Sequence, residues 1–269
     1  MDILIIGGSG YLGRELVRQA RAAGHRVAAT YHRRPVAAAG VTWHPLDLRD
    51  RRAVAALSAE VVVNAAYRKA EWATTADGAL HVAAAAAATG ARLVHVSSDA
   101  VFSGAARSYP ETSDPDPVTP YGAAKAAAET AVRGLTPSAV IARTSLIVGD
   151  GGSVHETRVH ALATGASGGA LFTDDVRCPV HVADLAAALL ELAASPYAGV
   201  HHVAGPDAVS RHELGTLIAR RDGLDPARLP AALRAGSPDP GPLDVRLDCT
   251  ATRSRLRTRL RGAREFLRS

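Results

Sequence analysis

The sequence predicts an α/β protein built on a doubly wound parallel sheet, with a small C-terminal lobe. Two features of its 269 residues carry this prediction. The chain opens on a short apolar run that ends in a cluster of glycines, and short apolar runs then alternate with Ala-rich segments of helical spacing. Strands that alternate with helices in this way are typical of βαβ units, whose strands pair in parallel. The length suits one large domain, or a domain with a small additional lobe.

Each element follows from a local pattern. Residues 2–6 are apolar and rich in β-branched side chains, as in a buried parallel strand. Residues 12–20 have helical spacing, and residues 26–30 predict the second strand. Further strands are expected at 41–44, 61–64, 92–96 and 139–143, and further helices at 50–57, 71–89 and from about 119.

The glycines after the first strand predict a dinucleotide site. Gly7, Gly10 and Gly13 have the spacing G-x-x-G-x-x-G between a strand and a helix. In that context glycines let the backbone turn tightly and approach a pyrophosphate, which lies at the helix N-terminus. A simple glycine-rich turn is the alternative. The other candidate contacts in this turn are Ser9, Tyr11 and Leu12.

The end of the second strand predicts which dinucleotide binds. An acidic residue about 20 residues past the glycines would hold the ribose 2′-hydroxyl of NAD. Residues 30–34 are Thr-Tyr-His-Arg-Arg and contain no carboxylate. Arg33 and Arg34 are suited to a 2′-phosphate through charge-assisted hydrogen bonds. We therefore predict NADP(H) rather than NAD(H), with His32, Arg33 and Arg34 at the adenosine end.

A tyrosine and a lysine four residues apart suggest acid–base chemistry. Lys125 is one of only two lysines in the chain, the other being Lys69, whereas the remaining 29 of its 31 basic residues are arginine. Residues four apart share a helix face, so the ammonium can help Tyr121, a phenol with a free pKa of about 10, to exchange a proton near neutral pH. A surface tyrosine beside a solvated lysine is the alternative interpretation.

Composition limits the other function classes. The chain is 47% hydrophobic and 21% charged, as in soluble globular proteins. No run of about 18 apolar residues occurs and the chain begins in a strand, so we expect neither a membrane span nor a signal peptide, and a cytoplasmic location. Cys178 and Cys249 lack metal-ligand spacing, so no metal site is expected. The net charge is +5, and seven arginines lie between residues 253 and 268. We interpret these arginines as part of a solvated C-terminal helix rather than as a nucleic-acid-binding surface.

These motifs together resemble the extended short-chain dehydrogenase/reductase family, and within it the dTDP-4-dehydrorhamnose reductase branch. The resemblance covers nearly the whole chain. It rests on Gly-Gly-Ser-Gly-Tyr-Leu-Gly at 7–13, Asp-Leu at 47–48, Val-Val-Asn-Ala-Ala at 62–66, His-Val-Ser-Ser-Asp-Ala-Val-Phe-Ser-Gly at 95–104, Tyr-Pro-Glu-Thr at 109–112, Pro-Tyr-Gly-Ala-Ala-Lys at 120–125, Arg-Thr-Ser at 143–145, Cys-Pro-Val-His-Val-Ala-Asp-Leu-Ala at 178–186 and Leu-Asp-Cys-Thr at 247–250.

The resemblance implies a Rossmann fold with an NADP-binding domain over residues 1–150. Residues 151–269 would form mostly a substrate-binding lobe, with some elements returning to the core. Ser98 would be the catalytic hydroxyl with Asp99 beside it, Tyr121 the proton donor and Lys125 its electrostatic partner. Ser98 and Tyr121 would also contact the substrate, and Tyr121 and Lys125 the cofactor, with Lys125 holding the nicotinamide ribose. The remaining implied contacts are Asp47 and Leu48 at the adenine, Asn64, Ala65, Ala66 and Ser97 in the cofactor groove, and Arg177 on a substrate phosphate.

Several of these positions have structural alternatives. Ser97 and Ser98 could cap a turn, Asp99 could be structural, and Arg177 could be a surface arginine. The branch usually carries aromatic residues where this chain has Ala100 and Leu146, and the second of these aromatics is expected to contact the sugar.

The activity implied is therefore NADPH-dependent reduction of a nucleotide-linked 4-keto-6-deoxy sugar, or of another small carbonyl compound. An epimerase or dehydratase that recycles bound NAD and a non-catalytic NADP-binding regulatory subunit remain open. The family often forms homodimers through the helix that carries the tyrosine, so a homodimer is the expected assembly.

Overall fold

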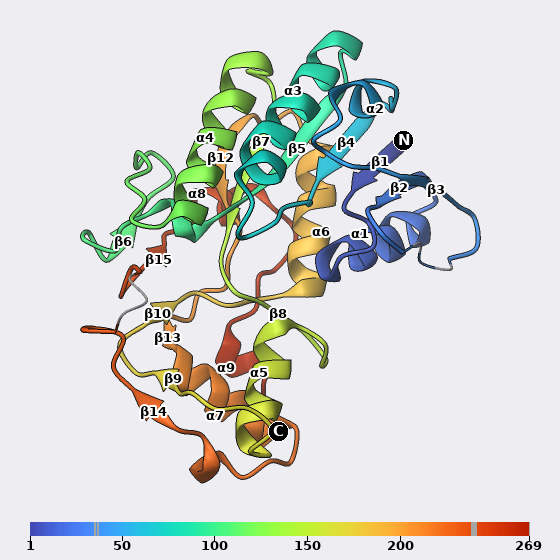
Figure 1. Cartoon of the computed structure of the whole chain (residues 1–269). Helices are drawn as coiled ribbons and strands as arrows, with labels where there is room; N and C mark the ends of the chain where they lie inside the picture. Colours follow the sequence, from blue (N-terminus) through green and yellow to red (C-terminus); the bar gives the residue numbers. More distant parts are fainter. Residues whose placement is uncertain (35, 37, 238–240, 269) are drawn as a thin grey trace. The chain divides into compact units, whose positions relative to one another are not determined.

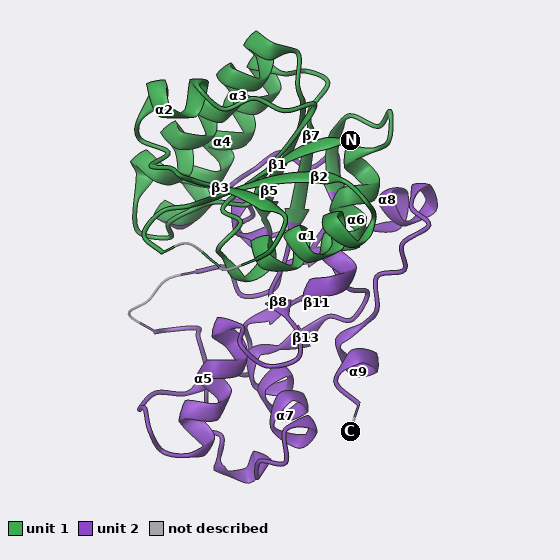
Figure 2. Cartoon of the chain, turned by 90° about the vertical axis from the view of Figure 1, so that its right-hand side faces the viewer, with its two compact units in different colours: residues 1–98, 120–143, 186–201 green, residues 99–119, 144–185, 202–269 purple. Residues whose placement is uncertain are grey.

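The computed structural model describes residues 1–34, 36, 38–237 and 241–268, and it divides into two compact units. Unit 1 comprises residues 1–98, 120–143 and 186–201, and unit 2 comprises residues 99–119, 144–185 and 202–269 (Figure 2). The two units alternate along the chain, so the compact units do not meet at one boundary near residue 150. The assignment of cofactor and substrate binding to residues 1–150 and 151–269 stays a prediction.

A seven-stranded sheet forms the centre of unit 1 (Figure 1), with the strand order β3-β2-β1-β4-β5-β7-β12. The pairings β1–β2, β2–β3, β1–β4 and β4–β5 are all parallel. Successive strands are added outward on either side of β1, which is the order of a doubly wound fold, so the predicted fold class is confirmed. The strands are β1 (Asp2–Ile6), β2 (Arg26–Tyr31), β3 (Val41–Pro45), β4 (Val61–Asn64), β5 (Arg92–Ser98), β7 (Val140–Thr144) and β12 (Gly199–His202).

Helices cover both faces of this sheet. In Figures 1 and 2, α2, α3 and α4 lie on one face and α1 and α6 on the other. The helices are α1 (Tyr11–Ala22), α2 (Arg51–Ala55), α3 (Gly78–Thr89), α4 (Pro120–Leu135) and α6 (Val182–Ala193). One buried cluster joins the strands to α2, α3 and α4, and the many alanines of α3 let that helix approach the sheet closely. Its members include Leu4, Val54, Val62, Val82, Ala83, Ala86, Leu93, Val132 and Ile141.

Two predicted helices differ in extent from those in the structure. The helix expected at 50–57 is the five-residue α2, whose N-terminus is capped by the Asp50 carboxylate through the amides of Arg52 and Ala53. The helix expected at 71–89 begins instead with a π-helical turn, η1 (Ala73–Asp77). Thr75 anchors that turn, since its hydroxyl both donates to the carbonyl and accepts from the amide of Arg68.

The glycine turn between β1 and α1 needs glycine at two positions for different reasons. Gly7 has φ +82°, a left-handed conformation that favours glycine. Gly13 has an ordinary φ, but a Cβ there would lie 2.1 Å from the carbonyl oxygen of Gly7. The first turn of α1 therefore packs directly on the backbone of the loop that precedes it.

Unit 2 is built around two helices, α5 (Val154–Ala163) and α7 (Arg211–Arg221), which share a buried apolar cluster with the short α9 (Ala263–Phe266). Four two-stranded pairings surround them: β8 (Ile147–Val148) with β11 (Val180–His181), β9 (Leu171–Phe172) with β14 (Ala231–Ala232), β10 (Val176–Arg177) with β13 (Val209–Ser210), and β6 (Ser108–Tyr109) with β15 (Arg246–Leu247). The remaining elements are α8 (Thr250–Arg255) and the 3-10 turns η2 (Asp99–Val101) and η3 (Pro226–Arg228).

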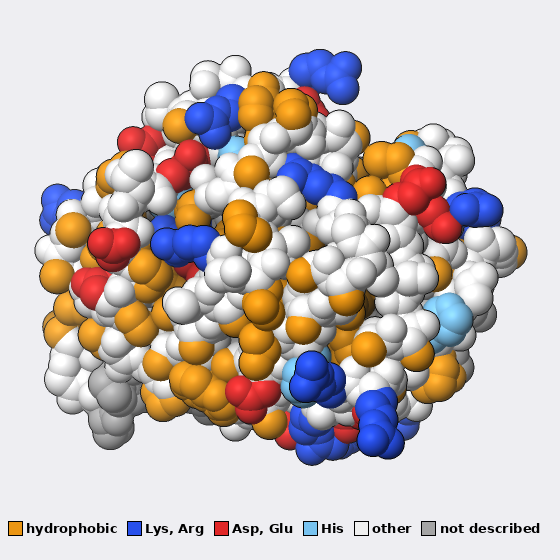
Figure 3. All heavy atoms as spheres, turned by 90° about the horizontal axis from the view of Figure 1, so that it is seen from above, with side chains coloured by type: hydrophobic (Ala, Val, Ile, Leu, Met, Phe, Trp, Pro, Cys, Tyr) orange, Lys and Arg blue, Asp and Glu red, His pale blue; other side chains and the backbone are white. Residues whose placement is uncertain are grey.

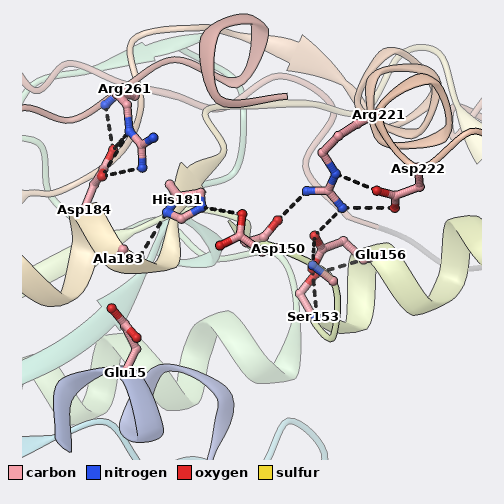
Figure 4. Close-up of polar contacts among 12 residues, drawn as sticks. Glu15, Asp150, Ser153, Glu156, His181, Ala183, Asp184, Arg221, Asp222 and Arg261 are labelled. Carbon is pink, nitrogen blue, oxygen red and sulfur yellow. Dashed lines mark hydrogen bonds and ion pairs between the residues drawn. The ribbon is translucent and has the colours of Figure 1, made fainter. Parts of the chain in front are cut away.

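Polar contacts fix α5 to α7 (Figure 4). Ser153 and Glu156 form a capping box at the start of α5. The same Glu156 carboxylate pairs with Arg221 of α7 at 2.8 Å while only 1% exposed. One buried acid thus caps one helix and ties it to the next.

We expect Gly13→Ala to destabilise unit 1 strongly. The added methyl would contact fixed backbone rather than a movable side chain, and overpacking of this kind costs about 3 kcal/mol or more. Gly134→Ala is the matched control, because a Cβ at this exposed position of α4 meets no atom within 4 Å and alanine favours a helix by about 1 kcal/mol. Urea unfolding of both variants measures the difference, and equal free energies of unfolding would contradict this account.

Candidate active site

The carboxyl edge of the unit 1 sheet gathers most of the predicted site residues. The glycine turn follows β1, His32–Arg34 follow β2, and Asp47 and Leu48 follow β3. The ends of β1 and β4 are joined directly, since the Ala65 amide donates to the Ile6 carbonyl at 3.0 Å. A Cβ on Gly7 would lie 2.9 Å from the amide nitrogen of Ala66. The turns after β1 and β4 therefore lie side by side, as a doubly wound sheet requires of a ligand site.

Lys125 is buried one turn after Tyr121 on α4. Its side chain is held by β5, because Nζ donates to the Val96 carbonyl at 2.8 Å, and the residue is only 3% exposed. The alternative of a solvated lysine is therefore wrong. Burial lowers the pKa of Lys125 to about 8, and the negative charge of Glu129 opposes that shift. The ammonium is thus still charged at neutral pH, where it can stabilise a phenolate.

Tyr67 completes an aromatic contact around this pair. Its ring centroid lies 5.6 Å from that of Tyr121, with the planes tilted by 46°. Lys125 Nζ lies 5.2 Å from the Tyr67 centroid, within cation–π range. The sequence analysis missed Tyr67, although it directly follows the residues at the end of β4 that were predicted to line the groove.

A buried ion pair lies beneath the lysine. Glu129, one turn beyond Lys125, pairs with Arg143 of β7 at 2.7 Å, with exposures of 0% and 1%. The Ser97 hydroxyl donates to the same carboxylate at 2.6 Å. The cofactor contact of Ser97 and the catalytic role of Ser98 stay predictions, and the sequence analysis missed Glu129 and Arg143.

Asn64 and His95 form a second buried contact between neighbouring strands. The Asn64 amide nitrogen lies 3.3 Å from His95 Nδ1, and its oxygen accepts from the Ala66 amide at 3.2 Å. Burial and the nearby charge of Lys125 hold the pKa of His95 well below its usual value of 6.5. The imidazole is therefore neutral, with Nδ1 accepting from Asn64. This orientation locks the turn at residues 64–66.

At the expected adenosine end, one carboxylate already pairs with an arginine, and two other arginines are exposed. Asp47 accepts from Arg49 at 2.6 Å, and this bond holds the pKa of the Asp47 carboxyl well below its usual range. His32 Nε2 lies 3.8 Å from Asp47. Arg33 and Arg34 are exposed and have no ion-pair partner among the described residues. Their guanidinium groups are thus available to an anionic ligand.

In unit 2, the residue after Ser98 is tied into a charged network. The Asp99 carboxylate accepts from the Ser145 hydroxyl at 2.6 Å and lies 3.7 Å from Arg177 Nε. Arg177 is 4% exposed and also pairs with Asp175 at 2.9 Å. Its Nη atoms donate further to the carbonyls of residues 176, 242 and 243. Arg177 is therefore not a surface residue, and these bonds favour the structural interpretation of Asp99. Its catalytic role and the phosphate contact of Arg177 stay predictions.

Unit 2 also contains a basic cavity of about 180 Å³. Two of its arginines, Arg211 and Arg234, pair with the fully buried Asp175 at 3.3 and 3.0 Å. Arg158 and His155 come from α5, and the apolar wall includes Phe172 and Leu214. Basic and apolar surface together suit a ligand with an anionic group and an apolar or aromatic group.

The two positions that depart from the family pattern lie on different local structures. Leu146 is 8% exposed and belongs to the apolar cluster of unit 2. Ala100 lies in the 3-10 turn η2. Leu146 is therefore a core residue, at the position where the branch usually carries an aromatic residue that is expected to contact the sugar.

Three further features of the described part of the chain concern metal ligands, membrane spans and surface charge. Among the described residues, no three His, Cys, Asp or Glu side chains are grouped to hold a metal ion. The helices of residues 1–34, 36, 38–237 and 241–268 include none long and apolar enough to cross a membrane. On the face seen in Figure 3, basic side chains are scattered among acidic and hydrophobic ones.

Comparison with known proteins relates the whole chain to one family. Residues 1–269 match the model described as RmlD substrate binding domain. The chain is 33% identical to the dTDP-4-dehydrorhamnose reductase of Mycobacterium tuberculosis over 259 residues, which are 89% of this chain and 82% of that protein. It is 31% identical to the spore coat polysaccharide biosynthesis protein SpsK of Bacillus subtilis over 242 residues, 84% of this chain and 81% of SpsK.

Solved structures agree in fold. A hypothetical dTDP-4-dehydrorhamnose reductase from Sulfolobus tokodaii has a TM-score of 0.83 at 29% identity, covering 97% of each chain. The dTDP-4-dehydrorhamnose reductase of Bacillus anthracis, solved in complex with NADP, has a TM-score of 0.83 at 22% identity, covering 98% of this chain and 96% of that one. At that lower identity the likeness speaks for the fold alone.

We expect His95 to make the protein less stable in mild acid. The unfolded imidazole takes up a proton near pH 6.5, whereas the buried His95 stays neutral, so stability is lost as the pH falls below about 6.5. The limiting slope is about 1.4 kcal/mol per pH unit. Urea unfolding between pH 7.5 and 5 should therefore show a steeper loss in the wild type than in His95→Gln. His44→Gln, on the edge strand β3, is the control, and equal slopes in the wild type and His95→Gln would rule out a neutral buried His95.

Proposed function

The chain belongs to the RmlD substrate binding domain family, and we propose that it is an NADPH-dependent ketoreductase acting on a nucleotide-linked 4-keto-6-deoxy sugar. The observation that carries this proposal is the buried, charged Lys125 one turn from Tyr121, on a helix held against the strand that ends in Ser98. Curated relatives of more than 30% identity that are named dTDP-4-dehydrorhamnose reductases support the same reaction class.

The glycine turn suits the pyrophosphate of a dinucleotide. The N-cap residue of α1 is Gly10, which has no side chain to occupy the helix N-terminus. The backbone amides of the first turn of a helix are suited to bind an anion. Arg33 and Arg34 would hold a 2′-phosphate, and the Asp47 carboxylate at this end already pairs with Arg49. Bound NADPH would supply the hydride.

The side chains of unit 1 supply the remaining chemistry. Tyr121 donates a proton to the oxygen of the ketone as it becomes an alkoxide, and Ser98 donates a hydrogen bond to the same oxygen. The tyrosinate that remains is stabilised by the Lys125 ammonium. Because Lys125 is also fixed by the Val96 carbonyl, its charge is held in one place and needs little reorganisation during the reaction.

The basic cavity of unit 2 supports a substrate with an anionic group. Its arginines suit a diphosphate, and its apolar wall, which includes Phe172, suits a base. Leu146 and Ala100 stand where aromatic side chains were expected, so the sugar has fewer aromatic contacts than the family pattern implies. A homodimer through α4 stays a prediction.

We expect turnover to depend on Tyr121. With enzymatically generated dTDP-4-dehydrorhamnose, the wild type should oxidise NADPH, and Tyr121→Phe should lower kcat by about 100- to 10,000-fold because the proton donor is lost. Loss of nicotinamide absorbance measures the rate, and Tyr197→Phe is the matched control. No wild-type turnover of this substrate, with NADPH still bound, would contradict the proposed substrate and favour another carbonyl compound or a binding function.

We expect the two exposed arginines to select the phosphorylated cofactor. The variant Arg33→Ala/Arg34→Ala should bind NADPH at least about 10-fold more weakly, because charge-assisted hydrogen bonds to the 2′-phosphate are lost, while NADH affinity stays close to that of the wild type. Fluorescence titration measures both dissociation constants. Arg133→Ala, an exposed arginine at the end of α4, is the control. A wild-type preference for NADH would overturn the cofactor assignment.

A further inference from the structure

Glu129 is the buried acid nearest in the helix to the proposed catalytic pair. Tyr121, Lys125 and Glu129 are spaced by four residues along α4, so they share one helix face. Lys125 and Glu129 are both almost fully buried, at 3% and 0% exposure. A buried carboxylate and a buried ammonium one turn apart affect each other more strongly than exposed groups do, because little water screens them.

Two consecutive residues of β5 bind this helix face. The Val96 carbonyl accepts from Lys125 at 2.8 Å, and the Ser97 hydroxyl donates to Glu129 at 2.6 Å. The next residue along the strand is Ser98. The contacts of Lys125 and Glu129 with β5 therefore set the register of α4 against the strand end that carries the proposed catalytic hydroxyl.

Arg143 fixes the Glu129 carboxylate from the neighbouring strand. Its Nε lies 3.0 and 3.2 Å from the two carboxylate oxygens, and Nη2 lies 2.7 Å from Oε2. Such a two-oxygen contact holds both the charge and the orientation of the acid. Arg143 therefore holds the Glu129 carboxylate in one orientation in the interior.

We propose that Glu129 is a positioning residue for the proposed reductase chemistry: it fixes α4 on β5 and β7 and places a buried carboxylate one helical turn from the Lys125 ammonium. The proposal rests on the proposed function, in which Lys125 must be charged to stabilise the Tyr121 phenolate.

The groups around Lys125 favour this role for Glu129. On α4, Tyr121 precedes Lys125 by one turn and Glu129 follows it by one turn. The neutral His95 of β5 and the Tyr67 ring after β4 also lie near the Lys125 ammonium. The Arg143 charge of β7 is engaged by Glu129 itself. Burial lowers the pKa of Lys125 and Glu129 raises it, so without the acid the ammonium would lose its proton at lower pH.

The small number of lysines makes a direct test feasible. A chain labelled with 13C at the lysine Cε gives signals only from Lys69 and Lys125, which Lys69→Arg assigns. In the cofactor-free wild type we expect the Lys125 signal to titrate near pH 8. The variant E129Q/R143M removes both buried charges, so that neither is left unpaired. In it, the midpoint should fall by about one pH unit.

Three further variants make the result decisive. E129D keeps the negative charge, so its Lys125 midpoint should stay close to that of the wild type. E129Q alone, where it folds, leaves the Arg143 charge unpaired, so its Lys125 midpoint should fall at least as far as that of the double variant. Glu156→Gln, which removes a buried carboxylate paired with an arginine in unit 2, should leave the midpoint unchanged. A folded E129Q/R143M with the wild-type midpoint would overturn the proposal, as would an equal shift in Glu156→Gln.

Kinetics separates this proposal from the proposed function. Where the wild type turns over the 4-keto sugar, kcat should fall at alkaline pH as the tyrosine–lysine pair loses its proton. The midpoint of this fall in E129Q/R143M should move in the same direction as the NMR midpoint. If the wild type does not turn over the sugar, the proposed substrate fails, and the NMR midpoint still decides the role of Glu129.

Discussion

The position of α4 on the sheet is the constraint on which the candidate site depends, and buried polar contacts set it. Apolar packing alone would let a helix rich in alanine slide or rotate on the strands, because small side chains leave few features to interlock. Here the Glu129–Arg143 pair and the Lys125–Val96 hydrogen bond each require one register. Breaking the buried pair on one side would leave an uncompensated charge, which costs about 3–5 kcal/mol. The same contacts that fix the helix therefore fix the tyrosine one turn earlier.

Backbone contacts hold the strand ends together at the carboxyl edge of the sheet. The turns after β1 and β4 approach so closely that only small residues fit between them, as at Gly7 against Ala66. Thr30, at the end of β2, accepts from the Gly7 amide at 3.0 Å and is 2% exposed. Three strand ends are thus held together without large side chains. Small residues at this edge let a ligand approach the backbone closely, which is the property a dinucleotide site needs.

Sequence patterns predicted the parts of this structure that depend on neighbouring residues. The first strand, glycine turn and helix follow from local spacing, as does the Tyr121–Lys125 pair. The register between α4 and the strands was not predictable. Glu129 contacts Arg143 on β7 and Ser97 on β5, and the sequence of the helix does not indicate which residues of other elements it contacts. The π-helical turn η1 was also missed.

The seventh strand shows how burial can hide a pattern. β12 contains His201 and His202, which a sequence reader counts as polar, yet both are 0% exposed. Their burial comes from tertiary packing, so the short strand lacked the apolar run that predicts a sheet core. Unit 2 was harder still to predict, because its paired strands are two residues long and their partners are distant in sequence.

Unit 2 extends the argument from a fixed helix to a fixed turn. Asp175 is shared by three arginines, two of which line the basic cavity. The third, Arg177, pairs with Asp99, the residue that follows Ser98 in the chain. A buried acid shared in this way keeps the arginines in place only while their charges are balanced. The charge balance of the cavity and the conformation of the turn after β5 therefore both depend on Asp175. A substitution at Asp175 should disturb both.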